Sequence, residues 1–345
     1  MKILIIGGTG TISSAITRQL AAEGHDLWLL NRGNRNSDLP QNVRLITGDI
    51  NEHPEEVMVK LGDETFDSVC EFIGFIPEQS ARDIRMFSGR TKQYVFISSA
   101  SAYNKPVRQH VITEGTTLAN PYWEYSRNKI ACESLLMKAY REEGFPVTIV
   151  RPSHTYCERS VPVGVHGKKG SWQVLKRMIE GKPVIVHGDG TSLWTMTWNE
   201  DFAKGFIGLL GNPQAIGEAF QIMSDESLTW NQIYQCIADT LGVEFRPYYI
   251  PSDYLAAVAP PTYDLRGGLL GDKAASVVFD CSKLKRAVPG FCATTRLEEG
   301  IRKAVSYIKE HPETQIEDQE FDLWCDRVIE TIEASKRTLM TLHDC

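Results

Sequence analysis

The sequence contains no apolar run that approaches the length of a membrane span. Its 345 residues are 42% hydrophobic and 23% charged, the proportions of a water-soluble globular protein. A spanning helix needs about 20 apolar residues, and no signal peptide precedes the first predicted strand. We therefore expect a cytoplasmic protein without a membrane partner. Its length allows one large domain or two of ordinary size.

Excess positive charge is also missing. The formal net charge is −7 at pH 7. Proteins that bind nucleic acid without regard to its sequence need a basic surface for phosphate contacts. The charge balance therefore opposes a nucleic-acid partner.

The sequence lacks the cysteine and histidine patterns of metal sites and redox pairs. The eight cysteines include no CxxC pair, and the eight histidines include no HxxxH or HExxH motif. Most cysteines fall within apolar patterns, which favours free buried thiols, and this is the simpler interpretation even for Cys157 near the site described below. We predict no metal centre.

Residues 2–31 have the pattern of a dinucleotide-binding unit. An apolar run leads into glycines at positions 7, 8 and 10, and an amphipathic helix pattern and a second apolar run follow. Strand, glycine turn, helix and strand within about thirty residues form the unit that seats a dinucleotide. Its pyrophosphate lies against the glycines and the positive N-terminus of the helix. The predicted cofactor residues here are Gly7, Gly10, Thr11 and Ile12.

Further apolar runs recur along the first half of the chain, separated by helical patterns or helix-length gaps. They lie at residues 43–46, 69–73, 94–97 and 147–150. Such alternation predicts an α/β fold with a doubly wound parallel sheet. Right-handed crossovers place the carboxyl ends of all strands at one edge, where ligands bind. The residues at those ends are the candidates for function.

The second apolar run ends at Asn31 and Arg32, without the acidic residue that would hold the ribose 2′-hydroxyl of NAD. Arg32, together with Arg35, could instead pair with the 2′-phosphate of NADP. A solvated loop arginine is the alternative. We slightly favour NADP over NAD and leave both open.

The next two runs end in further candidates for cofactor contact. Asp49 could accept a hydrogen bond from the adenine amino group while Ile50 packs on the ring, or Asp49 could cap the following helix. The following run ends Phe72-Ile73-Gly74, where a glycine lets another group approach the backbone closely.

A tyrosine and a lysine follow a strand that ends in serines. Tyr125 and Lys129 are four residues apart at the start of a helical pattern, so they share one face of the helix. A free phenol titrates near ~10, but a neighbouring ammonium and the positive nicotinamide of an oxidised cofactor both favour the phenolate. The serines at positions 98, 99 and 101 could be turn formers only. Together with the nucleotide-binding pattern, the pair predicts a catalytic site in which Tyr125 exchanges protons.

These motifs resemble the extended short-chain dehydrogenase/reductases, and specifically the NAD-dependent epimerase/dehydratase family, from residue 1 to about 245. The residues that carry the resemblance are Gly7-Gly8-Thr9-Gly10, the Ser99 turn, Tyr125-xxx-Lys129 and Arg151-Pro152. The resemblance implies a Rossmann domain over 1–155, with about 190–215 returning to it. It also implies a smaller C-terminal α/β substrate-binding domain over 156–345.

The resemblance also implies roles for individual residues. Tyr125 is the acid/base, Ser99 is a substrate hydrogen-bond partner, and Lys129 binds the nicotinamide ribose and lowers the pKa of the tyrosine. A homodimer through the helix of Tyr125 is a further implication.

Three departures from the family pattern mark a different substrate pocket. The 4,6-dehydratases carry Asp-Glu where this chain has Ala100 and Ser101, so dehydration lacks its acid and base. Trp194 stands where nucleotide-sugar enzymes have an arginine for the diphosphate. Ser153-His154-Thr155-Tyr156 follows Arg151-Pro152 in place of the usual motif. We name Ser101, His154 and Trp194 as candidate substrate contacts. A packed histidine and a core tryptophan are the alternatives.

The second half of the sequence predicts several further elements. We expect a helix at 172–179, a strand at 184–186, and a helix capped by Asp201. We also expect capping boxes at 229–232 and 295–298, a loop at 260–271 that could form a lid, and a final amphipathic helix.

The favoured hypothesis is an NAD(P)-dependent oxidoreductase or epimerase. It would act on a secondary alcohol or ketone of a small, sugar-like substrate. The alternative is a dinucleotide- or RNA-binding regulator without catalysis, because chloroplast stem-loop-binding proteins resemble the C-terminal half of the chain.

Overall fold

The computed structural model describes residues 1–33 and 39–341. Its contacts divide the chain into two compact units. The first consists of Met1–Tyr156, Thr195–Ser227 and Val277–Thr295. The second consists of Cys157–Trp194, Leu228–Ser276 and Arg296–Cys345. Which unit binds a substrate stays a prediction.

The first unit contains a seven-stranded sheet in which every strand pair is parallel. The spatial order is β11-β7-β5-β4-β1-β2-β3, so the chain runs outward from β1 in one direction and then returns to the other side. The α/β doubly wound prediction is therefore confirmed. The strands are β1 (Lys2–Ile6), β2 (Asp26–Asn31), β3 (Val43–Thr47), β4 (Ser68–Glu71), β5 (Tyr94–Ile97), β7 (Val147–Pro152) and β11 (Ala219–Ile222).

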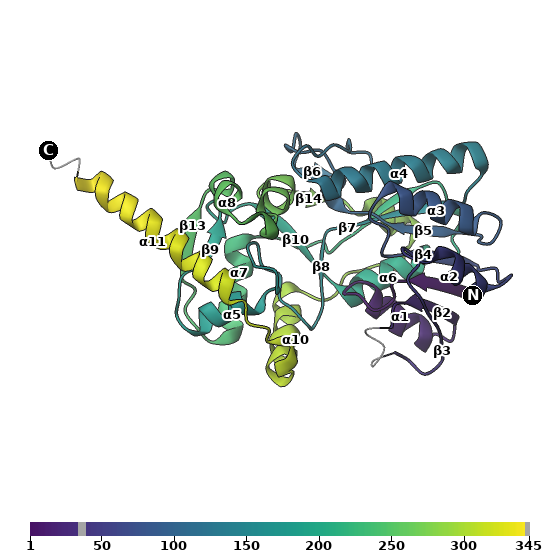
Figure 1. Cartoon of the computed structure of the whole chain (residues 1–345), viewed down its shortest axis with the longest axis horizontal. Helices are drawn as coiled ribbons and strands as arrows, with labels where there is room; N and C mark the ends of the chain where they lie inside the picture. The colour runs from purple at the N-terminus through teal and green to yellow at the C-terminus, as the bar shows by residue number, and fades with distance from the viewer. Residues whose placement is uncertain (34–38, 342–345) are drawn as a thin grey trace. The chain divides into compact units, whose positions relative to one another are not determined.

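Helices cover both faces of this sheet, as Figure 1 shows. They are α1 (Ser13–Ala22), α2 (Pro54–Leu61), α3 (Pro77–Phe87), α4 (Glu124–Glu143), α6 (Asn199–Leu209) and α9 (Ser282–Ala287). A proline at the first helical position starts α2 and α3, where the missing N–H costs nothing. Gly144, in the left-handed conformation, ends α4.

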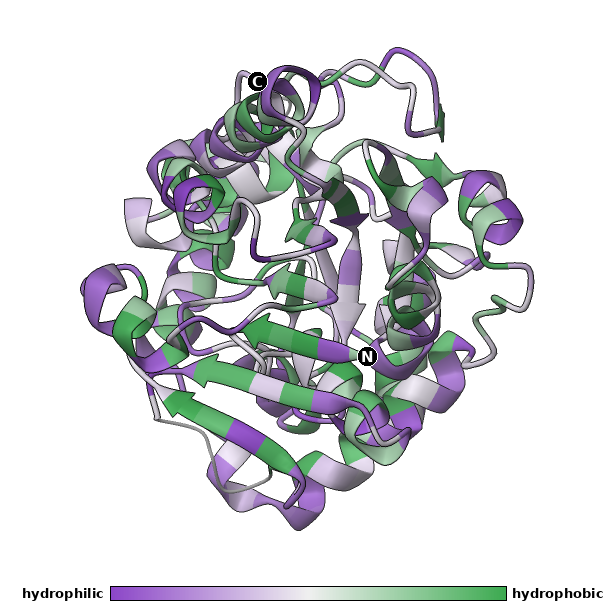
Figure 2. Cartoon of the chain, turned by 90° about the vertical axis from the view of Figure 1, so that its right-hand side faces the viewer, coloured by the Kyte–Doolittle hydropathy of each residue, from purple (hydrophilic) through white to green (hydrophobic). Residues whose placement is uncertain are grey.

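Side chains of β1 alternate between two separate cores because successive residues of a strand point to opposite faces. Ile3 and Ile5 pack with α1 and α6, whereas Leu4 and Ile6 pack with α2, α3 and α4. All four are fully buried. Figure 2 shows β1 as hydrophobic along most of its length, as expected for a strand covered on both faces.

Smaller elements complete the first unit. These are the short helices η1 (Ala100–Ala102) and η2 (Pro213–Ala215), the parallel pair β6 (Val111–Ile112) and β14 (Val278–Phe279), and the strand β8 (His154–Tyr156). The strands β10 (Leu193–Trp198) and β12 (Ser227–Thr229) each belong in part to the first unit and in part to the second. β8 and β10 pair in parallel, with His154 opposite Met196.

The second unit is mainly helical. It contains α5 (Trp172–Ile179), β9 (Val184–His187), α7 (Trp230–Leu241), β13 (Pro247–Ile250), α8 (Ser252–Val258), η3 (Pro261–Tyr263), η4 (Arg266–Lys273), α10 (Leu297–Glu310), η5 (Pro312–Thr314) and α11 (Gln319–Thr341). The helix at 172–179, the strand that begins at residue 184 and the capping box of Thr229 and Gln232 are as predicted.

Three local predictions are wrong. Asp201 lies inside α6, whose cap is Trp198. The capping box at 295–298 does not form, because α10 begins at Leu297 with Arg296 as its cap. Residues 260–271 are not an open loop, since they contain η3 and most of η4, a short π-helix.

The final helix, α11, docks on its own unit through its first half. Phe321 and Cys325 are buried, and Arg177 of α5 pairs with Asp322 and Asp326 at 2.7 and 2.8 Å. None of the described helices combines the length and the apolar character that crossing a membrane would require.

Candidate active site

The glycine turn after β1 is closed tightly against its neighbours. Gly7 has a positive φ of 83°, and a Cβ there would lie 2.6 Å from Cγ2 of Ile73. A Cβ at Gly8 would lie 2.7 Å from Cδ2 of Leu29. Both positions therefore require glycine.

Gly10 differs, because a Cβ there would meet only the hydroxyl of Ser13, at 3.4 Å. The Ser13 hydroxyl donates to the Gly7 carbonyl at 2.6 Å and accepts from the Gly10 N–H at 2.9 Å, so this serine ties the turn to the helix. The cap residue of α1, Ile12, offers no side-chain acceptor to the first turn of the helix. The open side of Gly10 and the helix start suit an anion such as a pyrophosphate.

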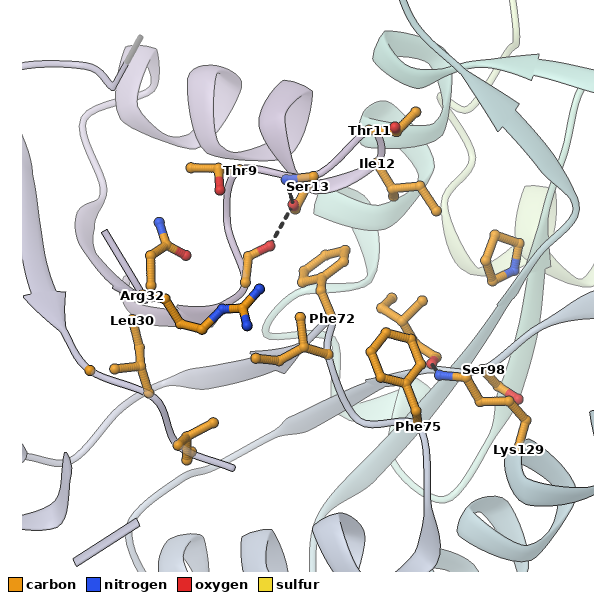
Figure 3. Close-up of a pocket in the computed structure, with 18 of the residues that line it drawn as sticks. Thr9, Thr11, Ile12, Ser13, Leu30, Arg32, Phe72, Phe75, Ser98 and Lys129 are labelled. Carbon is orange, nitrogen blue, oxygen red and sulfur yellow. Dashed lines mark hydrogen bonds between the residues drawn. The ribbon is translucent and has the colours of Figure 1, made fainter. Parts of the chain in front are cut away.

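A cavity of about 660 Å³ opens beside this turn, entirely within the first unit. In Figure 3 the glycine turn and the start of α1 lie on one side of it, Ser98 and Lys129 on the other, and Phe72 and Phe75 between. The predicted cofactor residues that line it are Gly7, Gly10, Thr11, Ile12, Asn31, Arg32, Ile50, Phe72, Tyr125 and Lys129. Its lining fits a dinucleotide.

Of the predicted adenosine contacts, Asn31, Arg32 and Ile50 line the cavity and Asp49 does not. The Asn31 side chain accepts from the Gly8 N–H at 3.0 Å. The Arg32 side chain is 67% exposed, and its guanidinium lies 3.9 Å from the Asp49 carboxylate. Asp49 is not a helix cap, because α2 begins at Pro54 after His53; it accepts instead from the N–H of Asn51. Arg35 lies outside the described residues.

Two buried ionisable side chains, Arg82 and Glu71, form hydrogen bonds to the backbone of residues that line the cavity. Arg82 donates to the carbonyl of Ile50, a lining residue, at 2.9 Å. Glu71, fully buried at the end of β4, accepts from the N–H of Ile73, also a lining residue, at 2.5 Å. Burial, together with the neighbouring Asp83, raises the pKa of Glu71 well above its usual value. The wall is therefore fixed by a polar network that sequence alone does not indicate.

Lys129 is a buried cation, only 1% exposed. Its ammonium donates to the carbonyls of Gly74 and Ile97, both at 2.6 Å. Desolvation lowers the pKa of Lys129 to about 8. A Cβ at Gly74 would lie 3.1 Å from the Phe96 ring, so the glycine permits the close packing of this segment. Gly74 thus contacts the lysine, and its contact with a cofactor stays a prediction.

Tyr125 lies in the first turn of α4 and lines the same cavity as Lys129. The lysine nitrogen is 5.7 Å from the centre of the Tyr125 ring and 4.9 Å from that of Phe75. Trp123 also packs against the tyrosine, with ring centres 4.9 Å apart. The helical spacing thus brings phenol and amine together, as the sequence predicts.

The serines after β5 form a compact turn. Ser98 lines the cavity and donates to the buried carboxylate of Glu133. Ser99 caps η1, its oxygen accepting from the N–H of Ser101 at 3.2 Å. Ser101 is only 2% exposed, and its hydroxyl contacts those of Ser99 and Ser126. A direct substrate contact by Ser101 stays a prediction.

The other candidate substrate residues lie in different surroundings. His154 is half-buried in β8. Trp194 is 2% exposed and stacks on Trp230 in the second unit, with ring centres 6.4 Å apart. Cys157 is buried, as the composition suggested. The roles of His154 and Trp194 stay predictions.

Sequence reasoning missed two groups that shape this site. Phe75 lines the cavity and packs against both Lys129 and Tyr125. Glu133 receives two hydrogen bonds from Arg151, at 2.9 and 2.6 Å, as well as that of Ser98. The only available signal was that Glu133 lies one further helical turn after Lys129.

Comparisons with known proteins agree with this geometry. The sequence model of the NAD dependent epimerase/dehydratase family matches residues 3–222. The chain is 25% identical to 2′-dehydrokanamycin reductase of Streptomyces kanamyceticus over 291 residues, covering 84% of this chain and 80% of that protein. It is 26% identical to the chloroplast stem-loop binding protein of 41 kDa b of Arabidopsis thaliana over 255 residues, covering 70% of this chain and 63% of that protein.

A solved structure shares the fold. UDP-glucuronic acid 4-epimerase from Bacillus cereus, in complex with UDP-glucuronic acid and NAD, superposes with a TM-score of 0.72 at 20% identity. The match covers 90% of this chain and 99% of that one.

Proposed function

Because the chain belongs to the NAD dependent epimerase/dehydratase family, we propose that it is an NAD(P)-dependent oxidoreductase or epimerase acting at a secondary alcohol or ketone of a sugar-like substrate. The observation that carries the proposal is the cavity that Tyr125, Lys129 and the glycine turn share. The names of its relatives, 2′-dehydrokanamycin reductase and UDP-glucose 4-epimerase, support a substrate of this class.

In the proposed reaction Tyr125, Ser99 and Lys129 have different roles. A bound nicotinamide dinucleotide supplies or accepts the hydride. Tyr125 takes the proton of the substrate hydroxyl in oxidation and returns it in reduction. Ser99 donates a hydrogen bond to the same oxygen, where negative charge develops. The buried ammonium of Lys129 favours negative charge on the tyrosine oxygen, since the pair lies in a partly dry cavity.

The phenol is tested by Tyr125→Phe, which removes the hydroxyl and keeps the ring. We expect unchanged dinucleotide affinity and turnover at least about a hundredfold slower, the usual contribution of a general acid or base. Rates are measured with 2′-dehydrokanamycin and UDP-glucose as first probes. Tyr140→Phe, on the same helix but half-exposed beside Gly217, is the matched control and should keep its rate. Undiminished turnover in Tyr125→Phe would remove this residue from the mechanism.

We further propose that the protein accepts NADP at least as well as NAD. No acidic side chain ends β2, and the exposed guanidinium of Arg32 lines the cavity where the adenosine ribose would lie. A guanidinium suits a phosphate group, with which it forms charge-assisted hydrogen bonds.

The preference is tested by measuring dissociation constants for both dinucleotides with Arg32→Gln. We expect the affinity for NADP to fall roughly fivefold to tenfold while the affinity for NAD stays the same, because only NADP carries the 2′-phosphate. Arg44→Gln, an exposed arginine on the neighbouring strand β3, is the control. Equal losses for NAD and NADP would contradict the assignment.

A further inference from the structure

Three serine hydroxyls form a chain of contacts from Ser126, in the first turn of α4, through Ser101 to Ser99, the cap residue of η1. From its geometry we infer that Ser126 and Ser101 are positioning residues that fix Ser99 as a hydrogen-bond donor to the substrate oxygen. The inference rests on the proposed function, in which Ser99 contacts that oxygen. It assigns a task to two buried residues of the site.

The contacts form an unbroken line. The Ser126 hydroxyl donates to the Ser101 oxygen at 2.7 Å, and the Ser101 and Ser99 oxygens are 2.9 Å apart. The Ser101 backbone N–H also donates to the Ser99 oxygen, at 3.2 Å. Ser126 is fully buried and Ser101 nearly so, whereas Ser99 is partly exposed. The line therefore has one buried end and one open end.

The number of protons on each hydroxyl determines which serine donates and which accepts along this line. A hydroxyl has one proton and two lone pairs. Ser101 already accepts from Ser126, so its own proton is satisfied only if it points to Ser99. The opposite orientation would leave a buried O–H without an acceptor, which is costly. Ser101 therefore donates to Ser99.

Ser99 then has both lone pairs filled, one by the Ser101 N–H and one by the Ser101 hydroxyl. Its remaining proton is free to point toward a ligand. Such a hydroxyl can donate to a ketone or alkoxide oxygen but cannot accept from an alcohol. Hydrogen bonds in a line also strengthen one another. The arrangement thus favours the negative charge that develops on the substrate oxygen during proton and hydride transfer over the neutral alcohol.

The serine turn is held in place independently of this line. The Asn120 side chain donates to the Ser101 carbonyl at 2.8 Å, and the Ala102 N–H donates to the Ser99 carbonyl at 3.1 Å. Removal of the Ser126 hydroxyl should therefore leave the turn intact and change only the orientation of the hydroxyl protons.

The test compares Ser126→Ala, Ser101→Ala, Ser99→Ala and the double variant Ser99→Ala/Ser126→Ala in the full chain, with 2′-dehydrokanamycin and UDP-glucose as probes. We expect kcat to fall about a hundredfold in Ser99→Ala, the usual loss of one oxyanion donor. It should fall roughly fivefold in Ser126→Ala and in Ser101→Ala, with dinucleotide affinity unchanged. The double variant should be no slower than Ser99→Ala alone. Ser134→Ala, an exposed serine of α4 bound only to the Ile130 carbonyl, is the control.

We call the action of Ser126 and Ser101 on Ser99 the relay. The outcomes distinguish a failure of the relay from a failure of the proposed function on which it rests. An unchanged kcat in both Ser126→Ala and Ser101→Ala, alongside a slow Ser99→Ala, overturns the relay alone. A double variant clearly slower than Ser99→Ala also overturns it, because a purely structural role of Ser126 would act without Ser99. Full activity of Ser99→Ala removes Ser99 from the mechanism and overturns the relay with it, whereas Tyr125→Phe tests the proposed function separately.

Discussion

Lys129 and His187 show how burial shapes single ionisable residues in this molecule. The Lys129 ammonium gives up water for two backbone carbonyls and the faces of Phe75 and Phe96. These contacts are individually favourable, but burial still lowers its pKa to about 8. A lysine so placed carries its charge at neutral pH at a cost in stability, which is a sign that its position serves the site.

His187 in the second unit offers a test of stability against pH. Its ring is 1% exposed, packs on Trp230, and contacts the Lys273 carbonyl at 3.3 Å. Burial lowers the pKa of His187 to about 4, against an unfolded value near ~6.5. Between these values the unfolded chain binds more protons, so the free energy of unfolding falls as the pH drops. The loss from this group is about 3 kcal/mol when complete.

We therefore expect His187→Gln to lose less stability between pH 7 and pH 4 than the wild-type protein. The measurement is denaturant unfolding across this pH range, followed by a probe of the second unit. His311→Gln replaces an exposed histidine of the same unit and should keep the wild-type slope. Identical slopes in wild type and His187→Gln would show that His187 does not titrate in this way.

The hydrogen-bond partners of single site residues could not be predicted from the sequence, because they lie far away along the chain. The spacing of Tyr125 and Lys129 predicted their shared face, because both belong to one helix. The carbonyls that hold Lys129 come from Gly74 and Ile97, 55 and 32 positions away. No local pattern reveals such partners. The same holds for Arg151, whose carboxylate partner Glu133 lies on α4.

At the scale of elements, periodic apolar patterns were reliable, whereas local end signals were correct at Thr229 and wrong at Asp201 and Thr295. Six of the seven strands of the large sheet, all except β11, and helices such as α1 and α4 follow directly from apolar spacing. Thr295 looked like a helix cap, but its N–H donates to Asp201 at 2.8 Å, and α10 starts two residues later. Asp201 itself serves this distant contact from inside α6. A tertiary hydrogen bond thus replaced two predicted caps.

The π-helix η4 is a similar case. Its segment contains Gly267, Gly268 and Gly271, which are turn signals in a sequence. In the structure Leu269 and Gly271 are buried. Packing within the second unit therefore overrides the local preference of glycine, and the predicted loop becomes ordered helix.

At the scale of the whole molecule, the predicted residues that line the cavity all belong to the first unit. The glycine turn after β1, the ends of β2, β4 and β5, and the start of α4 all line one cavity. The order of a doubly wound parallel sheet brings these ends together at one edge. Membership of the NAD dependent epimerase/dehydratase family agrees with this arrangement.

The central claim is that this cavity binds a nicotinamide dinucleotide against the glycine turn. Gly10→Ala tests it most directly, because a Cβ there meets only Ser13 within the protein yet fills the open side of the turn. We expect saturable binding of NADPH or NADH to the wild-type chain, followed by nucleotide fluorescence. Affinity should be roughly tenfold weaker in Gly10→Ala, at unchanged thermal stability. Gly115→Ala, a similarly open glycine of the first unit outside this cavity, should bind as the wild type does. Absence of saturable binding to the wild type, or equal affinity in Gly10→Ala, would contradict the account.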